Sequence, residues 1–247
     1  MNLVEVKNIV KVFGTLSALN DVSFSIKKGE IFALVGESGC GKTTLSRLIL
    51  RLIEPDAGAI YFKGRDIFEL KKSELRKVRA DMQIVFQDPV ASLNPKIKLR
   101  DAVAEPLIVH KYCEKVKLED RINELFELVG LDKTYLNRYP HEISGGEAQR
   151  VCIARSIALN PEFLVLDEPV SSIDYDAQDK IIKLLLDIKK KKDLTYLFIT
   201  HDLWLAKKIA DRIAVMKDGK IIETGQAAQV LRTPKSEYTK LLIESAI

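Results

Sequence analysis

Residues 36–44, GESGCGKTT, fit the pattern G-x-x-x-x-G-K-[ST], with Gly36, Gly41, Lys42 and Thr43 at its fixed positions. Glycine has no Cβ, so the backbone N–H groups of such a loop can approach phosphate oxygens closely. Lys42 adds a positive charge beside the β- and γ-phosphates, and the Thr43 hydroxyl can bind Mg²⁺. The segment therefore predicts a phosphate-binding loop, whose ligand-holding residues would be Gly36, Ser38, Gly39, Cys40, Gly41, Lys42, Thr43 and Thr44.

The residues on either side of this loop support the prediction. The apolar run Ile31–Val35 precedes it and indicates a buried strand. A helical pattern follows it, and its apolar face would comprise Leu45, Leu48, Ile49 and Leu52. A strand, a loop and a helix in this order direct the helix N-terminus toward a bound anion.

Two adjacent carboxylates end a second apolar run, Phe163–Glu168, which reads FLVLDE. A strand that ends in acids is the usual companion of a phosphate-binding loop, so Asp167 is expected to hold Mg²⁺. Glu168 is then placed to polarise an attacking water as a general base. The alternative is that both acids are only solvated residues at a strand end.

Polar side chains follow two further apolar runs. His201 comes directly after Tyr196–Thr200, and Gln87 comes directly after Met82–Phe86. Phosphate ligands gather at the carboxyl edge of parallel sheets, so a γ-phosphate contact is expected for His201. A neutral amide such as Gln87 can ligate Mg²⁺ and sense the γ-phosphate, although Gln87 taken alone favours a side chain without a functional role.

The segment Ile143–Arg150, ISGGEAQR, predicts the start of a helix. Ser144 and Glu147 have the S-x-x-E spacing of a capping box. Gly145 and Gly146 leave the helix N-terminus bare, as an anion site requires. Local spacing alone does not distinguish such a site from an ordinary capped helix.

Composition limits the possible classes of protein. The chain has 247 residues, of which 47% are hydrophobic, and a net charge of +4, which does not indicate nucleic-acid binding. No apolar run approaches the length of a membrane span, and the N-terminus does not resemble a signal peptide. The odd number of widely spaced cysteines favours neither a disulfide framework nor a zinc site: Cys40, Cys113 and Cys152.

The order of patterns predicts an α/β fold. Buried-strand candidates alternate with helical patterns, which indicates a mostly parallel sheet covered by helices. Residues 1–30 and 59–64 alternate polar and apolar side chains and are expected to form antiparallel strands. Residues 98–160 interrupt the alternation with helical patterns, including an apolar face in 118–129 that ends at Gly130.

Taken together, these segments resemble the ATP-binding subunit of ABC transporters over nearly the whole chain. GESGCGKTT resembles the Walker A motif, FLVLDE the Walker B motif and ISGGE the LSGGQ signature. Gln87, Asp174 (in SSID, 171–174) and His201 resemble the Q-loop, D-loop and switch residues. Six motifs in the family's order and spacing make this resemblance very specific.

The resemblance implies one nucleotide-binding domain over residues 1–247. Its P-loop NTPase (RecA-like) core and antiparallel β subdomain would comprise about 1–97 and 161–247, and its helical subdomain about 98–160. The implied reaction is hydrolysis of ATP with Mg²⁺, with Lys42, Gln87, Glu168 and His201 as catalytic residues and Thr43, Gln87 and Asp167 as metal ligands.

The family arrangement also implies a partner for the signature motif. In it, two ATP molecules lie between two subunits arranged head to tail, so Ser144, Gly145, Gly146 and Asp174 would serve the partner's nucleotide. Phe13 lies where the family places an aromatic ring on adenine; its alternative is a core residue of a strand.

Within the family, QDPVASLNP (87–95), PHEISGGEAQRV (140–151) and TPKSEYTKLLIES (233–245) resemble the peptide, oligopeptide and nickel importer branch. This implies a peripheral subunit on the cytoplasmic face of the cell membrane. Its partners would be two integral permease subunits, a second ATP-binding subunit, identical or homologous, and an extracytoplasmic solute-binding protein. The alternatives are a soluble ABC ATPase acting in DNA repair or on ribosomes, and a non-hydrolysing regulatory ATP binder.

Two residues give separate hypotheses. Glu147 replaces the usual signature glutamine, and we expect its carboxylate to turn back onto its own helix N-terminus rather than face a γ-phosphate. Cys40 lies inside the phosphate loop, where the helix N-terminus and Lys42 would favour a reactive thiolate. Its alternative is a small residue without a chemical role.

Overall fold

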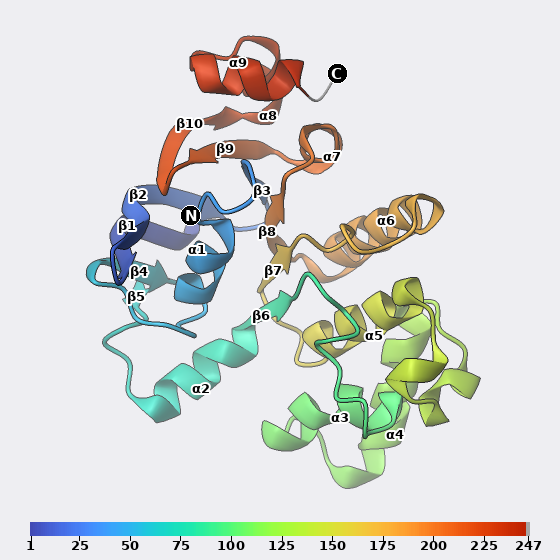
Figure 1. Cartoon of the computed structure of the whole chain (residues 1–247). Helices are drawn as coiled ribbons and strands as arrows, with labels where there is room; N and C mark the ends of the chain where they lie inside the picture. The colour runs from blue at the N-terminus through green and yellow to red at the C-terminus, as the bar shows by residue number, and fades with distance from the viewer. Residues whose placement is uncertain (246–247) are drawn as a thin grey trace. The chain divides into compact units, whose positions relative to one another are not determined.

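The computed structural model describes residues 1–245, apart from the side chains of residues 115, 175 and 176. The chain divides into two compact units (Figure 1). The first comprises Met1–Arg79 and the segment from Thr195 to the C-terminus, and the second comprises Ala80–Leu194. Each unit carries part of the predicted site.

An antiparallel sheet forms one part of the first unit. Its strand order is β2 (Leu16–Lys27), β1 (Asn2–Phe13), β4 (Ala57–Phe62), β5 (Arg65–Asp66). The buried residues of both strands are apolar, but their spacing is irregular, because the pairing of β1 with β2 contains register shifts. The antiparallel strands predicted within residues 1–30 and around residue 60 are confirmed.

A mostly parallel sheet forms the other part of the first unit. Its strands lie in the order β10 (Lys220–Gln226), β9 (Arg212–Lys217), β3 (Ile31–Val35), β8 (Thr195–Thr200). Strand β3 pairs in parallel with both β8 and β9, and every residue of β3 and β8 is buried. Parallel strands covered on both faces read as continuous apolar runs, which explains why these strands were predictable.

Helix α1 (Lys42–Ile49) follows β3 and the phosphate loop, as predicted. Leu45, Leu48 and Ile49 are fully buried, but the assignment of Leu52 to the same face was wrong. The helix ends at Ile49, Arg51 has a φ of 48°, and Leu52 is 48% exposed. The change of backbone direction at Arg51 turns Leu52 away from the core.

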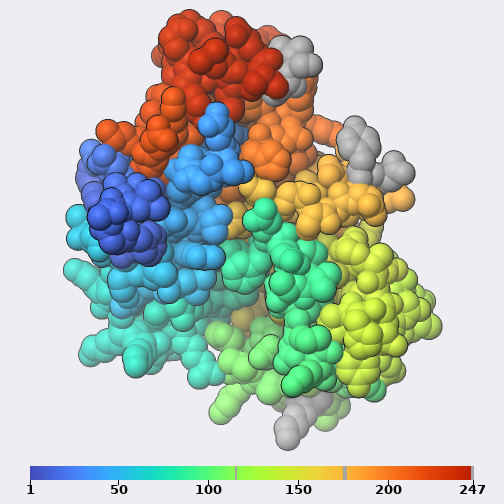
Figure 2. Space-filling model, viewed as in Figure 1, coloured from blue at the N-terminus to red at the C-terminus, as the bar shows by residue number. Residues whose placement is uncertain are grey.

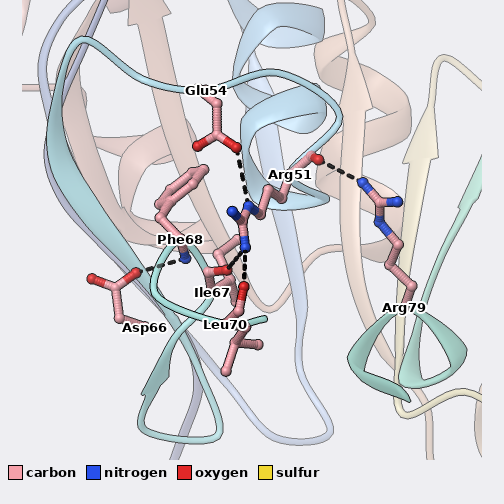
Figure 3. Close-up of polar contacts among 7 residues, drawn as sticks. All are labelled: Arg51, Glu54, Asp66, Ile67, Phe68, Leu70 and Arg79. Carbon is pink, nitrogen blue, oxygen red and sulfur yellow. Dashed lines mark hydrogen bonds and ion pairs between the residues drawn. The ribbon is translucent and has the colours of Figure 1, made fainter. Parts of the chain in front are cut away.

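Arg51 fixes the end of α1 to the chain that follows β5 (Figure 3). Its Nη1 donates to the carbonyl oxygens of Ile67 and Leu70, both at 2.8 Å, and its Nε donates to Glu54 at 3.1 Å. Arg79 of α2 (Lys72–Asp81) donates to the Arg51 carbonyl at 2.6 Å. These contacts fix the C-terminal end of α1, the helix that follows the phosphate loop.

The remaining helices of the first unit are α7 (Leu203–Ile209), α8 (Ala227–Arg232) and α9 (Glu237–Glu244). They follow β8 and β10 and cover buried residues of β3 and β9. Within residues 1–245, no helix combines the length and apolar character that a membrane span needs.

In the second unit, β6 (Met82–Val85) pairs in parallel with β7 (Phe163–Asp167). The strand predicted over 82–86 ends one residue early, and Phe86 is exposed. The connection between the two strands is helical, as predicted. It contains α3 (Leu99–Val109), α4 (Lys115–Leu128), η1 (Lys133–Asn137), η2 (Pro140–Glu142) and α5 (Gly145–Ile157).

Helix α4 buries the face predicted from its spacing, and Gly130 after it has a φ of 69°. This positive φ allows the Leu131 amide to donate to the Phe126 carbonyl at 2.9 Å and close the helix. Helix α6 (Tyr175–Lys192) follows β7 and ends in four lysines. The second unit thus joins a pair of parallel strands to a helical region.

Candidate functional site

The phosphate loop separates an exposed rim from a buried base. Glu37, Ser38 and Gly39 are exposed, whereas Cys40 and Lys42 are buried. The Lys42 ammonium donates to the carbonyl oxygens of Gly36 and Glu37, both at 2.8 Å. These bonds curl the loop around the ammonium, so its charge stands at the centre of the loop.

Glycine is required at Gly36, Gly39 and Gly41 of the loop for different structural reasons. A Cβ on Gly36 would lie 2.2 Å from the Met216 carbonyl oxygen, and one on Gly41 would lie 2.6 Å from that of Ala18. Those two positions are closed by neighbouring backbone. Gly39 has a φ of 84°, which L side chains rarely adopt, and its missing Cβ would meet nothing within 4 Å. Gly39 therefore opens onto the space where a ligand would approach.

The N-terminus of α1 has no side-chain cap. Its N-cap is Gly41, which supplies no side-chain cap hydrogen bond. The first turn of a helix has N–H groups without helical partners and a partial positive charge. With Lys42, this arrangement suits the oxygens of a polyphosphate.

His201 lies at the same sheet edge as the phosphate loop. Val35 pairs with Thr200 in the parallel register of β3 and β8, so Gly36 and His201 leave adjacent strands at the same level. The His201 side chain is exposed there. The expectation that sheet topology would bring these two motifs to one edge is confirmed.

Phe13 ends β1 with its ring 49% exposed, and the Lys11 ammonium lies 5.3 Å from the ring centroid. The alternative that Phe13 is a core residue of its strand is therefore wrong. An exposed ring is free to stack on a planar group.

The second unit brings the carboxylate motif and Gln87 together. Val85 pairs with Leu166, so the residues that follow β6 and β7 meet at one edge. Gln87 Nε2 donates to Glu168 Oε2 at 3.2 Å. Asp167 is buried, whereas Glu168 is half-buried and has a φ of 47°. This backbone conformation is uncommon for glutamate and is typical of functional sites.

Three contacts around Gln87 were not predicted from the sequence. The Ser172 hydroxyl donates to the Gln87 carbonyl at 3.1 Å, so the SSID segment contacts the Gln87 loop. Arg155 of α5 donates to the Ser92 carbonyl at 2.8 Å, and Cys152 lies 3.1 Å from the Ser92 hydroxyl. These partners are about 60 to 85 residues apart in the chain, so only the fold reveals them. The two contacts at Ser92 join the Gln87 loop, which contains Gln87 and Ser92, to α5, the helix that begins in the ISGGE segment.

Helix α5 begins with the predicted capping box. Ser144 Oγ accepts from the Glu147 amide at 3.4 Å, and Glu147 Oε2 accepts from the Ser144 amide at 2.8 Å. The Tyr135 hydroxyl donates to the other oxygen of Glu147. The expectation that this carboxylate turns back onto its own helix is confirmed. The Tyr135 contact was missed, because Tyr135 lies in η1, 12 residues before Glu147 and outside the capping-box pattern.

The pKa of Glu147 is held below its ordinary value, first by the Tyr135 hydrogen bond and then by the donors of Ser144. The charged form therefore stabilises the fold above the ordinary pKa of 4.5. This contribution disappears as the pH falls through the lower pKa of the folded protein.

We expect Glu147→Gln to change ATPase activity by less than about threefold, because the side chain caps its own helix. The same variant should lose less thermal stability than the parent does on acidification below about pH 5, because it has no carboxylate at position 147 to be protonated. Turnover assays and melting curves across pH measure the two effects. A gain of about tenfold in ATPase activity would mean that the Glu147 carboxylate faces the nucleotide.

Close packing inside the second unit does not explain the two signature glycines. A Cβ on Gly145 would lie 3.8 Å from the Ser172 carbonyl oxygen, and one on Gly146 would lie 3.5 Å from Ala177. Both are ordinary contact distances. Asp174 is exposed at the N-cap of α6, and its carbonyl accepts from the amides of Ala177 and Gln178.

The hypothesis of a reactive Cys40 thiolate was wrong. The side chain is only 7% exposed, and burial raises the pKa of the thiol, although the charge and hydrogen bonds of Lys42 oppose this. The Lys42 ammonium already donates to two carbonyl oxygens, so it stabilises a Cys40 thiolate less than an unpaired ammonium would. Local sequence shows the neighbouring cation but not the tertiary packing that removes water.

We therefore expect Cys40 to react slowly with iodoacetamide in the folded protein at neutral pH, because little thiolate is present and access is blocked. Mass spectrometry of the labelled peptides gives the rate, with the partly exposed Cys113 as the internal reference. Denaturation in guanidinium should remove the difference. Faster labelling of Cys40 than of Cys113 before denaturation would contradict the burial argument.

The donor set fits Mg²⁺. Asp167, Gln87 and Thr43 offer carboxylate, amide and hydroxyl oxygens, which are the hard ligands that Mg²⁺ prefers. Among the described residues, no group of three or more His, Cys, Asp or Glu side chains is placed to hold a metal ion.

Comparisons with known proteins agree with this geometry. The family model described as ABC transporter matches residues 19–171. The chain is 45% identical to the oligopeptide transport ATP-binding protein OppF of Bacillus subtilis (strain 168), over 98% of this chain and 82% of that protein. It is 47% identical to the dipeptide transport ATP-binding protein DppF of Lactococcus lactis subsp. cremoris (strain MG1363), over 98% and 80%.

Among solved structures, the chain is similar to the ATP-binding cassette MJ0796, a dimer in a post-hydrolysis state bound to ADP and phosphate. The TM-score is 0.81 at 32% identity, covering 91% of this chain and 98% of the cassette. The fold is that of a P-loop NTPase, in agreement with the predicted class. The chain belongs to the ABC transporter family, as an ATP-hydrolysing subunit.

Proposed function

We propose that this chain powers the uptake of peptides as an ATP-hydrolysing subunit of a binding-protein-dependent importer. The observation that carries the ATPase part is the buried Lys42 inside a glycine loop that follows β3, beside a bare helix N-terminus. The cargo is inferred from the relatives, which are transport proteins for oligopeptides and dipeptides. Those names favour peptides over nickel-type ligands and favour transport over DNA repair or ribosome action.

The first unit supplies the phosphate-binding residues in this proposal. Lys42 neutralises charge on the β- and γ-phosphates, and the loop amides at Gly39 and Gly41 donate to phosphate oxygens. Gly36, Ser38, Cys40 and Thr44 complete the loop through their backbone or hydroxyl groups. His201 contacts the γ-phosphate, and Phe13 stacks on adenine.

The second unit supplies the residues that act on water and metal. Thr43 of the loop, Gln87 and Asp167 would hold Mg²⁺, whose charge offsets that of the phosphates. Glu168 accepts a hydrogen bond from the attacking water and orients it for in-line attack. The Gln87–Glu168 hydrogen bond keeps the carboxylate in place before the nucleotide arrives. The products are ADP and phosphate.

The signature residues act on the nucleotide of a second ATP-binding subunit. Ser144, Gly145 and Gly146 present a helix N-terminus to a γ-phosphate, and Asp174 lies in the same face of the proposed interface. The room left at the two glycines supports this role, because no contact among the described residues requires glycine at either position. The similar cassette MJ0796 is described as dimeric.

We propose that residues 1–247 form one nucleotide-binding domain, with a helical subdomain at about 98–160 that docks on the permease. The bonds from Arg155 and Cys152 to Ser92 support this coupling, because they move the Gln87 loop with α5. The assembly would contain two integral permease subunits, a second ATPase subunit and an extracytoplasmic solute-binding protein. The chain would then lie at the cytoplasmic face of the membrane.

The test is to purify the tagged chain from membranes of its native cells and to measure uptake of labelled di- and oligopeptides in a deletion strain. We expect two integral membrane proteins to co-purify, and we expect uptake to return with the parent chain but not with Glu168→Gln. Nickel uptake serves as the comparison. A chain that stays in the soluble fraction with DNA-stimulated ATPase activity would overturn the transport role while leaving ATP hydrolysis intact.

A further inference from the structure

The C-terminal segment Thr233–Ser245 is attached to the first unit through Glu223 of β10. Glu223 accepts from the Lys235 amide at 2.9 Å and from the Ser236 amide at 3.1 Å, just before α9 begins. Burial opposes the charge of Glu223, but these amides outweigh it and hold the pKa of the carboxyl below its ordinary value. The start of α9 is thus fixed to the sheet.

One face of α9 packs on a buried cluster to which the strand that carries the phosphate loop contributes. Tyr238, Leu242 and Ile243 lie against a buried cluster that includes Ala33 and Val35 of β3. Tyr238 and Leu242 are four residues apart and so lie on one side of the helix, and Ile243 follows Leu242. Val35 is followed directly by Gly36, so this packing reaches the base of the loop. In Figure 2 the red residues near the C-terminus lie directly above orange residues of the same unit.

Tyr238 is the member of this face that contacts the end of β9. The Lys217 ammonium, at the end of β9, lies 4.5 Å from its ring centroid. The turn after Lys217 is bonded to the loop, because the Gly219 amide donates to the Cys40 carbonyl at 3.0 Å. The ring therefore covers the β9 end that supports the phosphate loop.

The Tyr238 hydroxyl is buried and makes no hydrogen bond within residues 1–245. Burial raises the pKa of Tyr238, the backbone amide of Glu37 opposes the rise, and the negative charges of Glu37 and Asp218 add to it. The phenol oxygen thus lies among loop residues. A buried hydroxyl without a partner is unfavourable and gains if a donor comes within reach.

We propose that Tyr238 is a positioning residue for the phosphate loop, through which the C-terminal helix sets nucleotide affinity. When phosphates draw the loop amides inward, the Glu37 N–H completes a hydrogen bond to the Tyr238 oxygen. The bond reaches hydrogen-bonding geometry when nucleotide is bound, and without nucleotide the Tyr238 oxygen stays near the Glu37 amide but outside that geometry. This inference rests on the proposed phosphate-binding role of residues 36–44.

The test is Tyr238→Phe in the full chain, with Mg·ADP binding measured by calorimetry and the KM for ATP measured in turnover assays. We expect binding about three- to tenfold weaker, as for the loss of one hydrogen bond, with a KM that rises in parallel. Turnover at saturating ATP should change less than about twofold, because the chemical groups are intact. The melting temperature without nucleotide should stay equal or rise, because the variant removes an unpaired buried hydroxyl.

Two further variants separate positioning from simple support. Tyr61→Phe makes the same chemical change on β4 of the same unit and should leave nucleotide affinity unchanged. Leu242→Ala removes a contact from the same face of α9 and should lower the melting temperature without weakening Mg·ADP binding as Tyr238→Phe does. Equal affinity of parent and Tyr238→Phe would refute the inference, as would equal weakening by Leu242→Ala. A parent chain that does not bind Mg·ADP would instead refute the proposed function.

Discussion

Replacing Glu168 with glutamine is expected to lower the kcat for ATP hydrolysis by about 100- to 10,000-fold, the range for loss of a general base. Glutamine keeps the shape of the side chain but has no carboxylate to accept a proton from the attacking water. Nucleotide binding should persist, because the phosphate loop is unchanged. Phosphate release assays and calorimetry with Mg·ATP measure the two quantities.

Glu105→Gln is the matched control, because Glu105 is exposed on α3 and undergoes the same chemical change. It should hydrolyse ATP at the parent rate. Near-normal turnover by Glu168→Gln would remove Glu168 from the role of general base. Loss of ATP binding by that variant would instead mean that the Gln87–Glu168 contact supports the nucleotide site itself.

Replacing Lys42 with alanine is expected to weaken Mg·ATP binding by at least about 100-fold, because a buried charge beside the phosphates is lost. The carbonyl oxygens of Gly36 and Glu37 also lose their donor, so the curl of the loop relaxes. Calorimetry with Mg·ATP and Mg·ADP measures the loss, and circular dichroism checks the fold. The effect should be larger for ATP, because Lys42 is expected to contact the γ-phosphate.

Lys72→Ala removes an exposed lysine from the start of α2 in the same unit and should leave affinity unchanged. Unaltered ATP binding by Lys42→Ala would show that the 36–44 segment is not the phosphate site. The two predictions are independent, since one removes binding through the first unit and the other removes turnover through the second.

The sequence predicts those elements whose pattern is continuous. Strands β3, β7 and β8 are almost entirely apolar, and α4 repeats its apolar positions at helical spacing. Helix α2 gave no such signal, because none of its residues is buried. Strand β10 was also missed, since it is a charged edge strand without a fully buried residue.

Within the candidate site, residues fixed by local geometry were predictable and residues fixed by tertiary packing were not. The Ser144–Glu147 capping box depends on a spacing of three residues and appears as expected. The burial of Cys40 depends on the surrounding fold, so its thiol chemistry was misjudged. The contacts of Tyr135 with Glu147 and of Arg155 with Ser92 join segments that no local pattern relates.

The central claim is that ATP is held between two ATPase subunits, with the signature of one closing on the phosphate loop of the other. The most direct measurement is native mass spectrometry of the Glu168→Gln assembly, purified from membranes with Mg·ATP present. We expect two ATPase subunits per assembly with two bound ATP molecules, and we expect Ser144→Arg in this chain to remove the retained nucleotide from its partner. Retention of ATP by single ATPase subunits, unchanged by Ser144→Arg, would contradict the account.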